Sequence, residues 1–253
     1  MHKDLFNKTL KTIKECGLLL RNTSEEKEAA VKYDGTIVTK YDLLLEKTLT
    51  NELKKISDVD IFSEELFFEQ NMNEENKTYF IIDPLDGTHN FNAGFDCFGI
   101  IVAYVENDIP VFSIVHFPTL DKTYTAIKGE GAYLNNKQIK VKNTINKDKA
   151  MGFCIVSEES LSDIQKIIKS DYNISLRSLA CTAAEICLLA EGIFDFYFSK
   201  NQCSIWDLIG TKLIIEEAGG IMKYNNSEGK GKYNVLAGTK EGISLIESIT
   251  KIV

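Results

Sequence analysis

The feature that most constrains the fold is an apolar run at residues 79–82 that leads into two aspartates, in the sequence YFIIDPLDGT. A short apolar run bounded by Pro and Gly predicts a buried strand that ends in a tight turn. One interpretation is structural, because Asp, Pro and Gly each favour turns. The other is functional, because two carboxylates held at one strand end can bind divalent cations such as Mg²⁺. This stretch by itself leaves both interpretations open.

The rest of the chain mixes helical and extended patterns. Amphipathic spacing predicts helices over 4–21 and 41–55, and a short strand is expected at 59–62. From 97 to 134, extended segments joined by short turns predict an antiparallel meander. Further strands are expected at 151–157, 173–178, 193–199, 221–224 and 234–238, with helices at 159–169, 182–191, 205–217 and from 241. This mixture predicts a layered α/β protein.

No internal repeat or low-complexity linker divides the chain. With 253 residues and a hydrophobic content of 44%, it is long enough to bury a sizeable core. We therefore expect a single domain over 1–253, which could divide into lobes at 1–150 and 151–253.

Composition excludes several classes of protein. The net charge is -8 and no dense Lys/Arg stripe is present, so we expect no nucleic-acid partner. The six cysteines form no C-x-x-C pair and the N-terminus does not resemble a signal peptide, which indicates reduced thiols in a cytoplasmic protein. The longest apolar run is far below the ~18 residues that span a membrane, so we expect a soluble chain with no membrane partner.

Acidic residues stand at the ends of four apolar elements. They are Asp42, Glu64 with Glu65, Asp83 with Asp86, and Asp207. Magnesium binds hard oxygen ligands, commonly one or two carboxylates together with water and substrate phosphate. The peptide carbonyl of Leu85 is a further plausible ligand, and Gly87 lets the backbone approach a phosphate closely.

Each of these acids also has a structural explanation. Ser204 and Asp207 fit a helix-capping signature, although the helix that follows is apolar around most of its circumference and so should bury this aspartate. Glu64 and Glu65 are also typical of a solvated strand end. Asp42 stands where the helix dipole favours an acid regardless of function.

Three segments together identify a family. SEE at 63–65, IIDPLDGTHNF at 81–91 and IWDLIGTKLIIEEAGG at 205–220 closely resemble the inositol monophosphatase family of magnesium-dependent, lithium-sensitive phosphatases. IVTKYD at 37–42, GEGAYLNN at 129–136 and residues 177–197 also resemble family segments. The resemblance covers nearly the whole chain. It implies a layered α-β-α-β-α sandwich that usually forms a homodimer.

The resemblance also implies roles for individual residues. Glu64, Asp83 and the Leu85 carbonyl would hold one Mg²⁺, and Asp83, Asp86 and Asp207 a second, with a third, weaker ion near Glu64. Thr88, supported by Asp42, would help to activate the attacking water, with Glu64 acting alongside. The remaining residues implied to contact phosphate or substrate are Asp86, Gly87, Thr88, His89, Thr182, Ala183, Lys200 and Asp207.

Two positions depart from the family pattern. His89 follows Thr88 where small or polar residues are common, so it either faces the substrate or lies on the surface. Lys200 stands where members acting on inositol phosphates have an acid that binds ring hydroxyls. A cation there favours a second anionic group on the substrate, unless it is simply a solvated loop lysine.

The resemblance leaves the substrate open. An inositol-1-phosphate-type monoester fits His89 and Asn90, because relatives that hydrolyse 3′-phosphoadenosine 5′-phosphate typically have Lys-Glu at this point. That nucleotide, fructose 1,6-bisphosphate and histidinol phosphate remain alternatives. A catalytically retired binding or regulatory protein is the alternative of a different class, which the complete set of acidic ligands disfavours.

Overall fold

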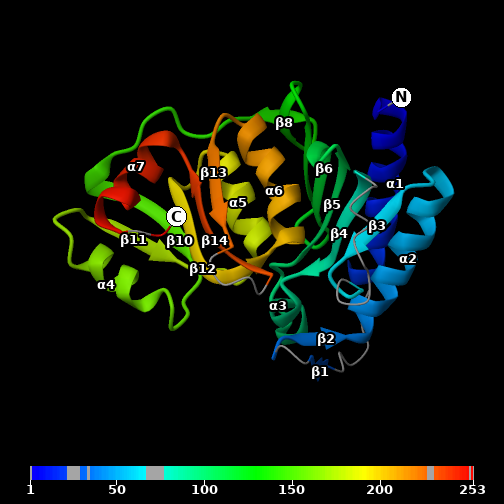
Figure 1. Ribbon diagram of the computed structural model, residues 1–253, viewed down its shortest axis with the longest axis horizontal. Helices are drawn as coiled ribbons and strands as arrows, with labels where there is room; N and C mark the ends of the chain where they lie inside the picture. The colour runs from blue at the N-terminus through cyan, green and yellow to red at the C-terminus, as the bar shows by residue number, and fades with distance from the viewer. Residues whose placement is uncertain are drawn as a thin grey trace.

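The computed structural model describes residues 2–21, 29–32, 35–66, 77–226, 231–250 and 252. Two sheets and three helical layers alternate in the order α-β-α-β-α (Figure 1). The layered sandwich expected from the sequence is therefore confirmed. None of the described helices combines the length and the apolar character needed to cross a membrane.

The larger sheet has seven strands in the order β3-β4-β5-β6-β7-β8-β9. Its strands are β3 (Asp60–Ser63), β4 (Thr78–Asp86), β5 (Gly99–Glu106), β6 (Ile109–Phe117), β7 (Lys122–Ile127), β8 (Gly131–Leu134) and β9 (Lys137–Ile139). β3 pairs with β4 in parallel and all other neighbours are antiparallel, so the predicted meander is present and gains the unpredicted β9. β4 is buried along most of its length because helices cover both of its faces, which explains its continuous apolar run.

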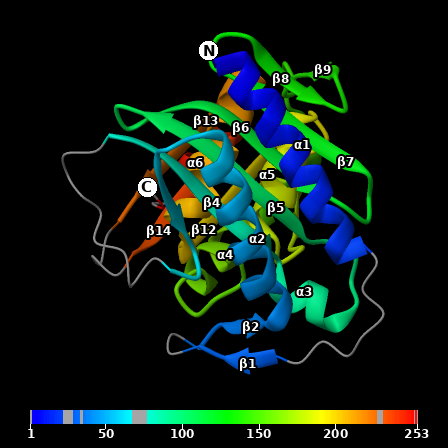
Figure 2. The ribbon, with the colours of Figure 1, turned by 90° about the vertical axis from the view of Figure 1, so that its right-hand side faces the viewer.

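Two long helices cover the outer face of this sheet. They are α1 (His2–Arg21) and α2 (Lys40–Ile56), which pack on each other and on β4, β5 and β6. Figure 2 shows both helices lying across the sheet, with the hairpin of β1 (Ala29–Val31) and β2 (Ile37–Thr39) at the same end as α3 (Thr88–Ala93). α3 contacts β2 at this end of the sheet.

The middle layer consists of α5 (Thr182–Ala190) and α6 (Ile205–Glu217). α6 packs on β4 to β8 on one side and on strands of the second sheet on the other, which explains why it is apolar all round. A Cβ atom at Gly210 would lie 2.4 Å from the Ile101 side chain, so only glycine allows this close approach. The middle of α6 thereby lies close against the larger sheet.

The smaller sheet has five strands in the order β11-β10-β12-β14-β13. They are β10 (Ala150–Cys154), β11 (Ile174–Arg177), β12 (Phe196–Ser204), β13 (Ile221–Asn225) and β14 (Lys232–Gly238). α4 (Leu161–Ile168) and α7 (Lys240–Ile249) form the outer layer, and the short 3-10 helix η1 (Lys147–Lys149) precedes β10. The expectation of one domain with lobes divided at 150 remains a prediction, although α6 contacts both sheets.

One expected strand is displaced along the chain. The strand predicted at 193–199 instead runs from Phe196 to Ser204, with an irregular register between Ser199 and Cys203. The sequence KNQ does not resemble a strand, but Asn201 adopts a left-handed backbone with φ of 50° and its amide donates to the Asn234 side chain at 3.1 Å. This bulge extends β12 directly into α6.

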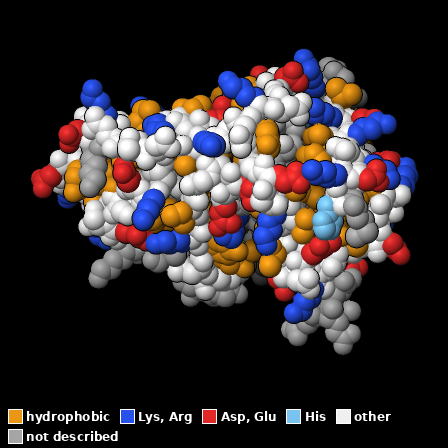
Figure 3. Space-filling model, turned by 90° about the horizontal axis from the view of Figure 1, so that it is seen from above, with side chains coloured by type: hydrophobic (Ala, Val, Ile, Leu, Met, Phe, Trp, Pro, Cys, Tyr) orange, Lys and Arg blue, Asp and Glu red, His pale blue; other side chains and the backbone are white. Residues whose placement is uncertain are grey.

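Charges of both signs share the surface seen from above. Figure 3 shows Lys and Arg side chains interspersed with Asp and Glu on that face. The expectation that the chain has no nucleic-acid partner stays a prediction.

Candidate metal centre

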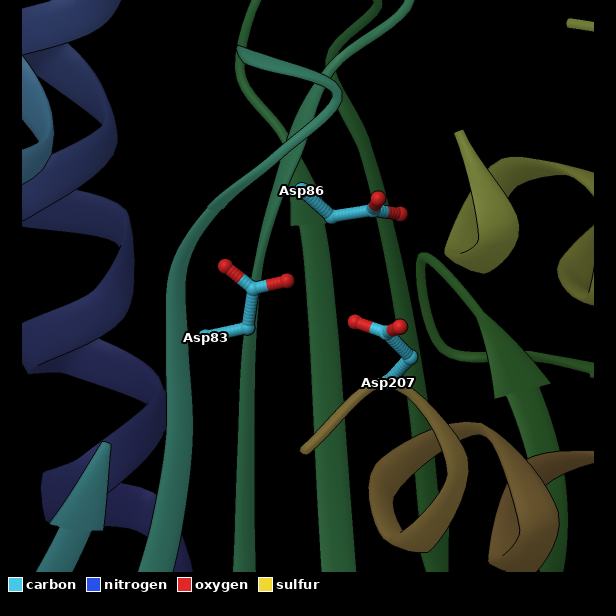
Figure 4. Close-up of side chains that lie close together, drawn as sticks. All are labelled: Asp83, Asp86 and Asp207. Carbon is cyan, nitrogen blue, oxygen red and sulfur yellow. The ribbon is translucent and has the colours of Figure 1, made fainter. Parts of the chain in front are cut away.

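Three aspartates from two distant segments converge at one end of the larger sheet. Asp83 and Asp86 lie near the end of β4, and Asp207 lies in the first turn of α6. Oxygen atoms of all three lie within 4.8 Å of one another. Figure 4 shows their carboxylates pointing into a shared space. The structure thus brings together the three aspartates that the sequence singled out.

A bulge in β4 turns its two aspartates to the same side. Asp83 pairs with Ile101 and Asp86 with Gly99, so three steps along β4 match two along β5. Without that extra residue, side chains three apart would point to opposite faces of the sheet. The Leu85 amide donates to Asp83 Oδ1 at 2.9 Å and fixes that carboxylate. The Asp-Pro-Leu-Asp sequence therefore makes a bulge within the strand rather than a turn after Ile82.

Asp207 caps α6 and also belongs to the aspartate cluster, so the capping and metal-binding interpretations are compatible. The Ser204 amide donates to Asp207 Oδ2 at 2.8 Å, and the Ser204 hydroxyl oxygen accepts from the Asp207 amide, which completes a capping box. Because capping uses one carboxylate oxygen, the other is left for the cluster with Asp83 and Asp86. Helix capping here positions a candidate ligand.

The negative charges of the three carboxylates favour binding of a cation. Burial and the charges of Glu64, Asp86 and Asp207 hold the pKa of Asp83 well above its usual range. Burial raises the pKa of Asp86 to about 6, and burial with the nearby Asp86 charge raises that of Asp207 to about 8. In the described part of the chain, no Lys or Arg forms an ion pair with any of the three. An all-oxygen donor set of this kind fits Mg²⁺.

Thr88 links the aspartate cluster to a fourth acid. Its hydroxyl oxygen lies 2.9 Å from Asp42 Oδ1 and 3.0 Å from the Leu85 carbonyl oxygen. Asp42 is only 2% exposed, and its other oxygen accepts the Thr39 amide at 2.7 Å in a second capping box. Asp42, like Asp207, caps a helix with one oxygen and faces the site with the other.

Gly87 is required between Asp86 and Thr88. Its φ is +86°, and a Cβ atom would lie 2.8 Å from the Cys97 carbonyl oxygen. No other residue type meets both conditions without strain. The glycine therefore lets the chain turn from β4 into α3 and present Thr88 to the site.

The start of α5 supports Asp86 from the side. The Ala183 amide donates to Asp86 Oδ2 at 2.7 Å, and the Cys181 thiol lies 3.1 Å from the same oxygen. The side chain of Thr182 lies 3.9 Å from the Cys203 sulfur. Thr182 and Ala183 thus adjoin the cluster, and their contact with substrate stays a prediction. No sequence pattern predicted the contact between Cys181 and Asp86.

Glu64 follows β3 but lies outside the cluster of three aspartates. Lys32 donates to Glu64 Oε1 at 2.8 Å and to Glu65 Oε1 at 2.7 Å. This lysine, which the sequence interpretation missed, stands next to the β1–β2 hairpin, far from Glu64 in the chain. The role of Glu64 as ligand and base stays a prediction, as does the third ion near it.

Replacing Lys32 by methionine is expected to lower the free energy of unfolding by about 1–3 kcal/mol, because it leaves the side chain of Glu65, only 7% exposed, without its cation. Lys55→Met is the matched control, since the exposed Lys55–Glu52 pair should contribute under ~0.5 kcal/mol. Urea unfolding of both variants measures the difference. Equal, small decreases in the free energy of unfolding for both variants would show that the ion pairs of Lys32 stabilise the fold no more than an exposed pair does.

The two departures from the family pattern have distinct surroundings. His89 is exposed at the start of α3. Lys200 forms an ion pair with Asp163 of α4, a residue with 0% exposure that also binds Lys166. The proposed contacts of His89 and Lys200 with substrate remain predictions.

The five-layer fold matches those of solved structures. The suhB extragenic suppressor protein of Bartonella henselae matches 99% of this chain and 100% of its own with a TM-score of 0.85 at 24% identity. The Thermotoga maritima IMPase matches 97% of this chain and 98% of its own with a TM-score of 0.82 at 25% identity. The fold is therefore that of inositol monophosphatase-type proteins.

Sequence comparison identifies the family directly. The model of the inositol monophosphatase family matches residues 3–245, and the chain belongs to that family. A 3′(2′),5′-bisphosphate nucleotidase of Haemophilus influenzae is 29% identical over 228 residues, 87% of this chain and 84% of its own. A fructose-1,6-bisphosphatase/inositol-1-monophosphatase of Aquifex aeolicus is 34% identical over 204 residues (79% and 75%). Inositol monophosphatase 1 of Bos taurus is 31% identical over 197 residues (74% and 70%).

Proposed function

We propose that the protein is a magnesium-dependent phosphatase that hydrolyses a small phosphate monoester. The observation that carries this proposal is the cluster of the buried Asp83 with the half-buried Asp86 and Asp207, whose oxygens lie within 4.8 Å of one another. Three carboxylates this close together stay ionised only when a cation binds between them; without one their pKa values rise. Membership of a family whose relatives bear phosphatase names supports the same activity.

The residues present fit the expected metal. Asp83, Asp86 and Asp207 would hold Mg²⁺, with the Leu85 carbonyl and Glu64 as further ligands for a second or third ion. Bound Mg²⁺ supplies the chemistry of lowering the pKa of water, neutralising the phosphate and stabilising the leaving oxygen. The chain itself must then position the water and the phosphate.

Thr88 is the residue best placed to orient a nucleophilic water. Its hydroxyl can donate to Asp42 Oδ1 at 2.9 Å, which leaves the Thr88 oxygen free to accept a hydrogen bond from water. Asp42 is itself fixed by its capping contact with Thr39. The amides of Gly87 and Thr88 would bind the phosphate, because Gly87 has no side chain to obstruct it. Glu64 would act as base or ligand beside them.

The proposed substrate is an inositol-1-phosphate-type monoester. The His89-Asn90 pair supports this branch over that of the 3′(2′),5′-bisphosphate nucleotidases. Hydrolysis of 3′-phosphoadenosine 5′-phosphate or fructose 1,6-bisphosphate is the second candidate, favoured by the names of two relatives. Histidinol phosphate is a further alternative within the family. A homodimer, lithium sensitivity and a cytoplasmic location belong to the same proposal.

Phosphate release tests the activity. The panel contains p-nitrophenyl phosphate, inositol 1-phosphate, 3′-phosphoadenosine 5′-phosphate, fructose 1,6-bisphosphate and histidinol phosphate, each with Mg²⁺ and with EDTA. We expect release from at least one ester that requires Mg²⁺ and is lost in EDTA. Release that is indifferent to EDTA would contradict the metal mechanism. No release from any ester would favour a binding protein that has kept the fold.

A further inference from the structure

We propose that Glu185 and Asn90 are positioning residues for the metal centre. Together they fix residues 179–183, and this segment in turn holds Asp86 where it can bind a cation. The inference rests on the proposed function, because it concerns the same site. Neither residue is itself a candidate metal ligand, so each acts through the segment that lies between them.

Residues 179–183 lead into α5 and supply hydrogen bonds that reach Asp86. The Ala183 amide and the Cys181 thiol both donate to Asp86 Oδ2, at 2.7 Å and 3.1 Å. Burial raises the pKa of Asp86, whereas these two contacts lower it, so they favour the ionised carboxylate that a cation requires. A shift of the segment would therefore displace the Asp86 carboxylate and weaken metal binding.

The backbone of this segment is strained. Ala180 has a φ of 52°, a left-handed conformation that is unfavourable for a residue with a Cβ atom. Such a conformation persists only where the surrounding structure fixes it. The segment must therefore be held by its neighbours, and it is contacted from two different helices.

Glu185 holds the segment from α5. Its side chain is fully buried, with 0% exposure, and it accepts hydrogen bonds from the amides of Leu179 and Ala180. Burial, and then the nearby charge of Asp86, make an ionised Glu185 unfavourable and raise its pKa to about 8. A residue that is unfavourable for the fold in this way is expected where it serves a functional site.

Asn90 holds the segment from α3. This half-buried residue donates from its side-chain amide to the Leu179 carbonyl oxygen at 2.7 Å and to the Cys97 carbonyl oxygen at 2.8 Å. Cys97 lies just before β5, which pairs with β4. Leu179 is therefore held on both sides, because Glu185 accepts from its amide and Asn90 donates to its carbonyl.

Calorimetric titration of Mg²⁺ into protein stripped with EDTA tests the inference with two variants at Glu185. Glu185→Leu removes the acceptor and keeps a similar size, whereas Glu185→Gln keeps a carbonyl oxygen that can accept. With its raised pKa, the wild-type carboxyl group is mostly neutral at pH 7, so glutamine is a close mimic. We expect the Kd for Mg²⁺ to rise about 10- to 100-fold in Glu185→Leu and to stay within about threefold in Glu185→Gln.

Asn90→Ala is an independent variant, because it removes the contact to Leu179 from the other helix. We expect a rise of about tenfold or more in the Kd for Mg²⁺. Ile246→Ala is the control for lost stability, since Ile246 of α7 is buried in a core cluster that contains none of residues 179–185. It should lower the free energy of unfolding and leave the Kd unchanged.

Three results would overturn the inference. A wild-type Kd in Glu185→Leu or in Asn90→Ala would show that the contact does not position Asp86. Equal rises in Glu185→Gln and Glu185→Leu would show that the acceptor oxygen is not what matters. A rise of the same size in Ile246→Ala would assign the effect to lost stability.

Two further comparisons keep the test decisive. If Glu185→Leu does not fold, as judged by circular dichroism, Asn90→Ala decides the outcome in the same way. Wild type that binds Mg²⁺ and shows the expected Kd changes, but releases no phosphate from any ester, would contradict the proposed function and support this inference.

Discussion

Asp83→Asn is expected to reduce Mg²⁺-dependent phosphate release by about 10³-fold or more, while the folded protein becomes more stable in EDTA. Asp83 is 1% exposed and central to the cluster, so its carboxylate has no substitute as a ligand. Asparagine keeps the shape and removes a charge that burial and three neighbouring acids disfavour. The gain in unfolding free energy should be on the order of 1–3 kcal/mol.

Asp171→Asn is the matched control for this substitution, because Asp171 is exposed and far from β4 in the chain. It should change neither turnover nor stability appreciably. Turnover is measured at saturating Mg²⁺, and stability by urea unfolding in EDTA. An Asp83→Asn protein that keeps near-wild-type turnover would show that the cluster does not carry the chemistry. A loss of turnover together with a loss of stability would instead indicate that the variant fails to fold correctly.

In EDTA, the free energy of unfolding is expected to fall as pH rises from about 4 to 8. The pKa values of Asp86 and Asp207 are raised to about 6 and about 8, while in the unfolded chain both lie near ~3.9. The folded state therefore binds more protons across this window, and stability is highest at its acidic end. Each group contributes at most about 1.4 kcal/mol per pH unit until its folded pKa is passed.

Saturating Mg²⁺ should remove most of this pH dependence, because a bound divalent cation favours the ionised carboxylates. Part of it should persist, since burial also raises the pKa of Glu185 in α5 to about 8 and that of Glu65 to about 7, and both lie outside the cluster. Glu185→Gln measures the contribution of Glu185. Urea unfolding at pH 5, 6, 7 and 8, with EDTA and with Mg²⁺, gives the comparison. A metal-free stability that rises toward pH 8 would contradict the described electrostatics.

Local sequence rules predicted the elements that carry the site. The apolar run before Asp83 predicted the strand observed as β4. The apolar residues around the whole circumference of 205–217 predicted a buried helix, which is α6. The capping signature of Ser204 and Asp207 was also correct, and proved compatible with the aspartate cluster rather than an alternative to it. These features depend on neighbours within a few residues, which is why a sequence can show them.

Contacts between distant segments could not be predicted in the same way. Lys32 reaches Glu64 across 32 positions, and Lys232 reaches Ser204 across 28. The extension of β12 through Lys200 depends on Asn234 of β14, whose side chain accepts from the Asn201 amide. Such pairings are set by the order of strands in the sheets. They decide where these lysine side chains lie.

Calorimetric titration of Mg²⁺ tests whether Asp83, Asp86 and Asp207 form a metal centre. The protein is first stripped with EDTA and dialysed, and wild type, Asp83→Asn, Asp207→Asn and the control Asp171→Asn are compared at one pH. We expect saturable binding to wild type and Asp171→Asn, and at least about tenfold weaker binding to the other two. Wild-type affinity in Asp83→Asn and Asp207→Asn would contradict the assignment of the three aspartates as a metal centre.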